Sequence, residues 1–194
     1  MKKVNGEASV VVLTIGHSTR TLEDFISLLL EYGVQRVVDI RTISRSRHNP
    51  QFNREELPSS LKAVGIGYVH MSGLGGLRRS VSDSANTGWR SLSFRGFADY
   101  MQKEEFGKSL RALIELAKTE RLALMCAEAV PWRCHRSLIA DALSVRGVQV
   151  QHILSSTSLQ SHKVTPWAKV DGTHITYPSE EPHHMRSSKV EKSL

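Results

Sequence analysis

Residues 10–40 have the sequence VVVLTIGHSTRTLEDFISLLLEYGVQRVVDI, which contains three predicted elements in succession. The apolar and β-branched run at 10–15 is typical of a strand that is buried on both faces. Residues 21–32 place apolar side chains at helical spacing, with Thr21 at the start and Gly33 as the stop. Residues 34–40 predict a second strand. This succession favours a parallel strand–helix–strand unit.

The same alternation continues along the chain. Further strands are predicted at 66–71, 122–126 and 148–154, and further helices at 53–65, 94–102, 105–118 and 134–146. We therefore predict an α/β fold, with a mostly parallel five-stranded sheet and helices on both faces. A single core domain is expected at 8–155. Residues 156–194 are expected to form a C-terminal extension, with a candidate short hairpin at 164–177 and then a disordered tail.

The composition excludes several classes of protein. The chain has 194 residues, 40% of them hydrophobic and 23% charged, with two cysteines. These values argue against membrane-spanning, fibrous and disulfide-rich proteins. The apolar run near the N-terminus is expected to be a strand, since no small-residue cleavage site of a signal peptide follows it. We expect a cytoplasmic protein with free thiols.

A net charge of +7 suggests an anionic partner, and the arginines indicate where it binds. Ligands of open α/β sheets bind outside the carboxyl ends of the strands. Eight of the sixteen arginines and none of the ten lysines follow predicted strands. Arginine offers a planar donor fork that suits phosphate and carboxylate. The candidates for substrate binding are Arg41, Arg47, Arg78, Arg133 and Arg136, together with His70. Alternatively, several of these arginines only face solvent or pair with Asp39 and Glu128.

The densest group of reactive side chains is CAEAVPWRCHR, residues 126–136, between a predicted strand and a predicted helix. Cys126 and Cys134 are candidate nucleophiles, because a helix start and nearby arginines favour thiolates. His17, His70, His135 and Glu128 are candidate bases for them. Asp39 and Glu128 are the carboxylates at this edge and could orient a base or a ribose hydroxyl. The alternative for Cys126 is a small buried apolar side chain, and for the carboxylates a structural pairing with arginine.

Two familiar uses of a loop that carries cysteine and arginine, a phosphate cradle and a zinc site, fit this sequence poorly. Cys126 and Arg133 are separated by six residues, one more than the phosphatase signature allows, and Pro131 removes one N–H donor. The cysteines also lack the paired spacing of zinc sites, so no metal ligands are assigned. A metal-linked or redox-linked protein that uses Cys126, Cys134 and histidines remains an alternative.

Several segments together resemble domain-of-unknown-function family 488. They are GHS at 16–18, VDIR at 38–41, SRHNPQFN at 46–53, YVH at 68–70, LGG at 74–76, GWR at 88–90, FRGFADYM at 94–101 and CAEAVPWRCHRS at 126–137. The resemblance runs from about residue 10 to 153. It implies an α/β fold and assigns no reaction. Its signature positions are His17, Asp39, Arg41, His70, Glu128, Cys134, His135 and Arg136. TIS at 42–44 departs from the pattern, where a proline is expected.

The leading hypothesis is an enzyme that acts on a phosphate-bearing substrate, a nucleotide or a nucleic acid. A non-catalytic nucleic-acid-binding module is the first alternative, since aromatic and arginine side chains interleave between Trp89 and Phe97. The sequence predicts no membrane partner, and it indicates neither a cofactor nor an oligomeric state.

Overall fold

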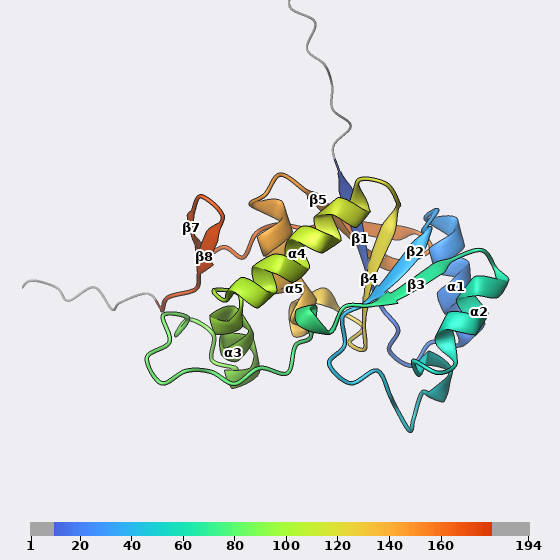
Figure 1. Ribbon diagram of the computed structural model, residues 1–194, viewed down its shortest axis with the longest axis horizontal. Coiled ribbons are helices and arrows are strands. Elements are labelled where there is room, and N and C mark those ends of the chain that lie inside the picture. Colours follow the sequence, from blue (N-terminus) through green and yellow to red (C-terminus); the bar gives the residue numbers. More distant parts are fainter. Residues whose placement is uncertain (1–9, 180–194) are drawn as a thin grey trace, which may run out of the picture.

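The apolar runs along the chain form the parallel strands of one central sheet (Figure 1). The computed structural model describes residues 10–179. The parallel strands are β1 (Val11–Gly16), β2 (Arg36–Asp39), β3 (Gly67–His70), β4 (Leu122–Cys126) and β5 (Gln149–Ser155). The sheet order is β3-β2-β4-β1-β5-β6, so the α/β class and the mostly parallel sheet are confirmed.

The sheet has six strands, where five were predicted. The additional strand, β6 (Ser158–Ser161), pairs antiparallel with β5 at the edge of the sheet. Its sequence SLQS lacks an apolar run because three of its four residues are exposed, so hydrophobic periodicity cannot reveal it. β7 (Lys169–Asp171) and β8 (His174–Thr176) pair in a separate two-stranded sheet. Most of the tail that was expected to be disordered, residues 180–194, lies outside the described residues.

Helices connect the strands and cover both faces of the sheet (Figure 1). They are α1 (Leu22–Glu31), α2 (Leu57–Ala63), α3 (Leu92–Tyr100), α4 (Glu104–Ala117) and α5 (Arg136–Ser144). Within residues 10–179, three short 3-10 turns lie in the loops, namely η1 (Pro50–Phe52), η2 (Ser72–Leu74) and η3 (Pro131–Arg133). Thr21 caps α1, since its hydroxyl accepts a hydrogen bond from the Asp24 N–H.

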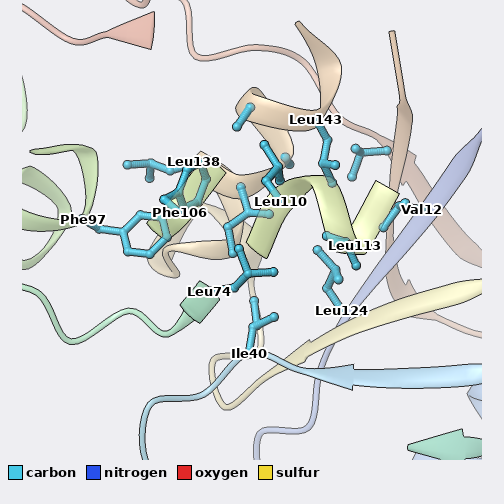
Figure 2. Close-up of a cluster of buried hydrophobic side chains, with 14 of the residues drawn as sticks. Val12, Ile40, Leu74, Phe97, Phe106, Leu110, Leu113, Leu124, Leu138 and Leu143 are labelled. Carbon is cyan, nitrogen blue, oxygen red and sulfur yellow. The ribbon is translucent and has the colours of Figure 1, made fainter. Parts of the chain in front are cut away.

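The two faces of the sheet take alternate residues of each strand. In β4, Leu122, Leu124 and Cys126 join the apolar cluster beneath α3, α4 and α5. Figure 2 shows this cluster, with side chains of α4 and α5 packed over the strands. Ala123 and Met125 of β4 point to the opposite face, into the cluster beneath α1 and α2. Cys126 therefore lies on the face of the sheet that α5 covers, and Cys134 and His135 lie just before the first turn of that helix.

A crevice is expected where neighbouring strands send the chain in opposite directions. β3 lies beside β2 on the side away from β4, whereas β5 lies beyond β1 on the other side of β4. The chain thus leaves the ends of β2 and β4 in opposite directions. The topology predicts a binding site between Asp39, the last residue of β2, and Cys126, the last residue of β4.

Among the residues described, none of the helices has both the length and the apolar character needed to cross a membrane.

Candidate active site

A cavity of about 290 Å³ opens at the ends of β2 and β4, where the topology places a site. We call it the Cys126 cavity. Six of the residues that the sequence singled out line it, namely Arg41, Cys126, Glu128, Arg133, Cys134 and His135. The rule that ligands bind beyond the carboxyl ends of parallel strands thus leads to this cavity.

Cys126 and Cys134 lie next to one another at the floor of this cavity, because η3 turns the chain back toward the end of β4. Both side chains are buried. The Cys134 thiol faces the Cys126 sulfur, and this contact lowers the pKa of Cys126 well below its usual value. The same contact raises the pKa of Cys134, which keeps its proton. Cys126 is therefore the thiol that ionises first.

The His135 ring completes the group and presents one particular nitrogen to the thiols. Its Nε2 lies 3.1 Å from the carbonyl oxygen of Ile40, which can only accept, so Nε2 carries the proton. Nδ1 then faces the sulfurs, 3.7 Å from Cys134 Sγ. Gly76 packs flat against this ring, where any Cβ would collide with it. His135 Nδ1 is thereby positioned to accept a thiol proton.

A second cavity of about 430 Å³, lined by His17 among other residues, lies beside the Cys126 cavity, and Arg41 lies between the two. We call it the His17 cavity. Arg41, Ile43, Ala127 and Glu128 line both cavities, which therefore adjoin. Arg41 is fixed by two hydrogen bonds to the Asp39 carboxylate, of 2.9 and 2.7 Å, and by one to the Phe52 carbonyl. Its remaining nitrogen, NH1, lies 3.3 Å from His17 Nε2.

The charges at this junction are set by burial and by pairing. Burial raises the pKa of the Asp39 carboxyl, but the hydrogen bonds and charge of Arg41 outweigh it, and the net pKa is lowered. Burial lowers the pKa of His17, and the Arg41 charge adds to this effect. His17 Nδ1 donates to the Ser18 carbonyl at 2.9 Å, so its Nε2 holds the lone pair that faces Arg41. Asp39 is thus ionised and His17 is neutral near pH 7.

Arg136 lies beneath the loop that follows β4 rather than in a cavity. Its side chain is buried, and NH2 donates to the Ala129 carbonyl at 2.8 Å. Among the described residues, its Nε and NH1 have no hydrogen-bond partner. Gly16 allows the loop to approach β1, since a Cβ there would collide with the Glu128 carbonyl. Arg136 therefore places a buried positive charge beneath the loop that follows β4.

The other predicted residues divide between the cavities and more distant places. Glu128 and Arg133 are exposed at the rim of the Cys126 cavity. His70 donates from Nε2 to the Arg41 carbonyl at 2.8 Å and so supports the loop after β2. Arg47 is exposed on that loop. The Arg78 guanidinium lies 3.7 Å above the Tyr100 ring and lines a different hollow, beside Arg79 and Asp99.

The apolar rim of the Cys126 cavity consists of Ile43, Leu77 and Phe94, of which the sequence pointed only to Phe94, within the aromatic and arginine segment 89–97. Ile43 and Leu77 are 64% and 65% exposed, which is unusual for large aliphatic side chains. A usable signal was present, since both are isolated aliphatic residues in polar loops that follow strands. An apolar rim over a polar floor suits a substrate that has an apolar or aromatic portion besides its charged group.

Comparison with models of protein families identifies a match to the chain. The model of the family described as "Domain of unknown function DUF488" matches residues 21–143, from the start of α1 to α5. Among curated proteins and among solved structures, no match to the chain is found. The matched range contains Asp39, Arg41, Cys126, Cys134 and His135, whereas His17 precedes it. Since this range covers more than half of the chain, the protein belongs to the DUF488 family, as the resemblance of its motifs implied.

Proposed function

We propose that the chain is an enzyme that acts on a small phosphate-bearing substrate of about the size of a mononucleotide. One observation carries the proposal. An ionisable thiol, a second thiol and an oriented imidazole lie together at the floor of a cavity whose rim carries Arg133 and Glu128. Perturbed, buried titratable groups that converge in a cleft are typical of reaction centres.

In this proposal, each side chain has a distinct role. Arg133 binds the phosphate, since its exposed guanidinium is free to form charge-assisted hydrogen bonds at the rim. Arg41 adds positive potential from between the two cavities. The reaction takes place at Cys126, with Cys134 and His135 beside it, and Glu128 moves protons at the open side.

The size of the cavities favours a small molecule over a polymer. The Cys126 cavity of about 290 Å³ and the adjoining His17 cavity of about 430 Å³ together fall in the range of small-molecule sites. The aromatic rim residue Phe94 could support a base or another planar group. A cytoplasmic location belongs to the proposal as well, because it would keep both thiols reduced.

The nucleic-acid-binding alternative receives less support. Trp89 packs against Phe94, with ring centroids 4.8 Å apart, and also against Trp167 and Tyr177. Arg78 is held against Tyr100 and the Gly75 carbonyl. These side chains are thus engaged within the fold and do not form an open row of stacking platforms.

The proposed function is tested by incubating the protein with nucleoside monophosphates, nucleoside diphosphates and sugar phosphates. Products are followed by phosphorus NMR and mass spectrometry. We expect turnover of at least one class, loss of turnover in Cys126→Ser, and strong reduction in Glu128→Gln. Arg111→Ala, on the exposed side of α4, serves as a control that should retain activity. Turnover that survives in Cys126→Ser, or no turnover of any class, would contradict the proposal.

A further inference from the structure

We infer that Cys126, Cys134 and His135 form a zinc site that is open to the Cys126 cavity. The inference deepens the proposed function and rests on it for the use of the metal, but metal binding can be measured by itself. The three side chains each offer one ligand atom, and all these atoms lie within 4.8 Å of one another. Two thiolates and one imidazole are the donors that Zn²⁺ prefers.

The spacing of the donors is close to that of a bound ion. Zinc–sulfur and zinc–nitrogen bonds of about 2.3 and 2.0 Å separate tetrahedral ligands by about 3.5–3.8 Å. Cys134 Sγ and His135 Nδ1 are already 3.7 Å apart. The widest separation in the group is at most 4.8 Å, so closing on a metal requires movements of about 1 Å or less.

The surroundings of His135 match those of a metal-bound histidine. A ligating imidazole usually donates its other N–H to a carbonyl or carboxylate, which fixes the ring. His135 does so through Nε2 to the Ile40 carbonyl, and this leaves Nδ1 toward the sulfurs. Gly76 and Phe97 hold the ring from its sides. The Arg136 backbone N–H lies 3.5 Å from Cys134 Sγ, where it can donate to a thiolate.

The site would be open rather than closed. Structural zinc sites have four protein ligands, whereas catalytic sites have three and leave one position for water or substrate. Here the three donors lie at the floor of a cavity, and the exposed Glu128 carboxylate lines the same cavity. Binding replaces the thiol protons with one Zn²⁺, and the fourth position faces the space where the phosphate-bearing substrate is proposed to bind.

Sequence spacing could not reveal this site. Recognisable zinc motifs place two cysteines on one tight turn. In this chain, Cys126 ends a strand and Cys134 follows η3, and seven residues lie between them. The turn at Pro131 brings the two sulfurs together in space, which only the fold can show.

Cobalt substitution tests the inference directly, because these are the only two cysteines in the chain. The full-length protein is stripped with a chelator and titrated with Co²⁺. We expect about one equivalent to bind, with a thiolate-to-cobalt charge-transfer band and the visible bands of tetrahedral Co²⁺. Zn²⁺ should displace the Co²⁺ and abolish these bands. Zinc measured by mass spectrometry after gel filtration should also approach one equivalent.

Variants then assign the ligands. Cys126→Ser, Cys134→Ser and His135→Gln should each lose most of the bound cobalt, whereas Glu128→Gln should bind it like the native chain. Circular dichroism confirms that each variant is folded. If a variant does not fold, the native chain still decides the question. The absence of a charge-transfer band in the native chain, or an unchanged band in Cys126→Ser, would overturn the inference.

The zinc site and the proposed function can be contradicted independently of one another. Tight binding of one zinc ion without turnover of any phosphate-bearing substrate would uphold the metal site and contradict the proposed function. Turnover that is blocked by alkylation of Cys126, in a native chain that binds neither cobalt nor zinc, would uphold the proposed function and overturn the metal site.

Discussion

Asp39 holds Arg41 in a single position between the two cavities. Both side chains are buried, and Tyr68 donates a further hydrogen bond of 2.8 Å to the Asp39 carboxylate. Removing one partner of a buried ion pair leaves the other charge without compensation, which costs far more than the pair contributes net. The position of Arg41 therefore depends on the carboxylate beneath it.

Asp39→Asn should lower the free energy of unfolding by about 3–5 kcal/mol near pH 7, because Arg41 loses its buried counter-charge. Glu120→Gln is a matched control, since it breaks the partly exposed pair with Arg36 and should cost about 1 kcal/mol or less. Urea denaturation measures both. Because the pKa of Asp39 is lowered on folding, its contribution should also disappear as the pH falls through that lowered pKa. Equal losses in the two variants would contradict this account.

At the residue scale, the sequence could predict which strand ends carry chemistry but not the direction of each side chain. Cys126, Cys134 and His135 were found because strand ends and helix starts meet at one edge. Arg78 follows a strand in the same way, yet its side chain stacks on Tyr100 of α3. That contact depends on how α3 packs, and a single sequence does not contain this information.

At the scale of elements, a chain of hydrogen bonds joins β1, β5 and β6 to α5. Thr14 bonds to His152 at 2.7 Å, His152 to His162 at 3.0 Å, and His162 to the Asp141 carboxylate at 2.8 Å. Asp141 also accepts from Tyr177 at 2.8 Å. This network fastens the edge strand that periodicity missed, and His162 gave no signal because it follows a polar strand.

This network predicts that the free energy of unfolding falls at acid pH. Burial lowers the pKa of His152 from its ordinary 6.5 to about 3, and the nearby His162 and Arg136 add to this effect. The unfolded chain therefore takes up a proton near pH 6.5 that the folded chain refuses until about pH 3. As the pH falls from about 6.5 to about 3, His152 should therefore lower the free energy of unfolding by about 1.4 kcal/mol for each unit of pH.

Urea denaturation from pH 7.5 to 4 checks this expectation. His152→Gln retains hydrogen-bonding groups but cannot take up the proton, so its stability should vary less with pH than that of the native chain. Parallel pH profiles for the two proteins would show that His152 is not the responsible group.

At the scale of the whole molecule, the segment after β6 forms part of the main core. Ile175 and Tyr177 are buried within the cluster that lies beneath α4 and α5. The alternation of strands and helices could predict the parallel sheet, because each such strand is apolar along its length. It could not predict this docking, which depends on two isolated apolar residues in a polar segment.

A chain that ends at residue 163 should therefore be less stable than one that ends at residue 179. It loses two buried side chains, worth about 3 kcal/mol or more together, and three hydrogen bonds to Asp141, two from Thr165 and one from Tyr177. Thermal unfolding of both chains measures the difference. Equal melting temperatures would mean that the segment does not contribute to the core in solution.

The central claim is that the Cys126 cavity binds a phosphate-bearing molecule through Arg133. Calorimetric titration with nucleoside monophosphates, sugar phosphates and inorganic phosphate tests it most directly. We predict saturable binding of at least one of them to the native chain, and binding at least about tenfold weaker in Arg133→Ala, which loses a charge-assisted hydrogen bond. Arg111→Ala removes the same charge on α4, away from the cavity, and should change the affinity by less than about twofold. No binding to the native chain, or equal weakening in both variants, would contradict the claim.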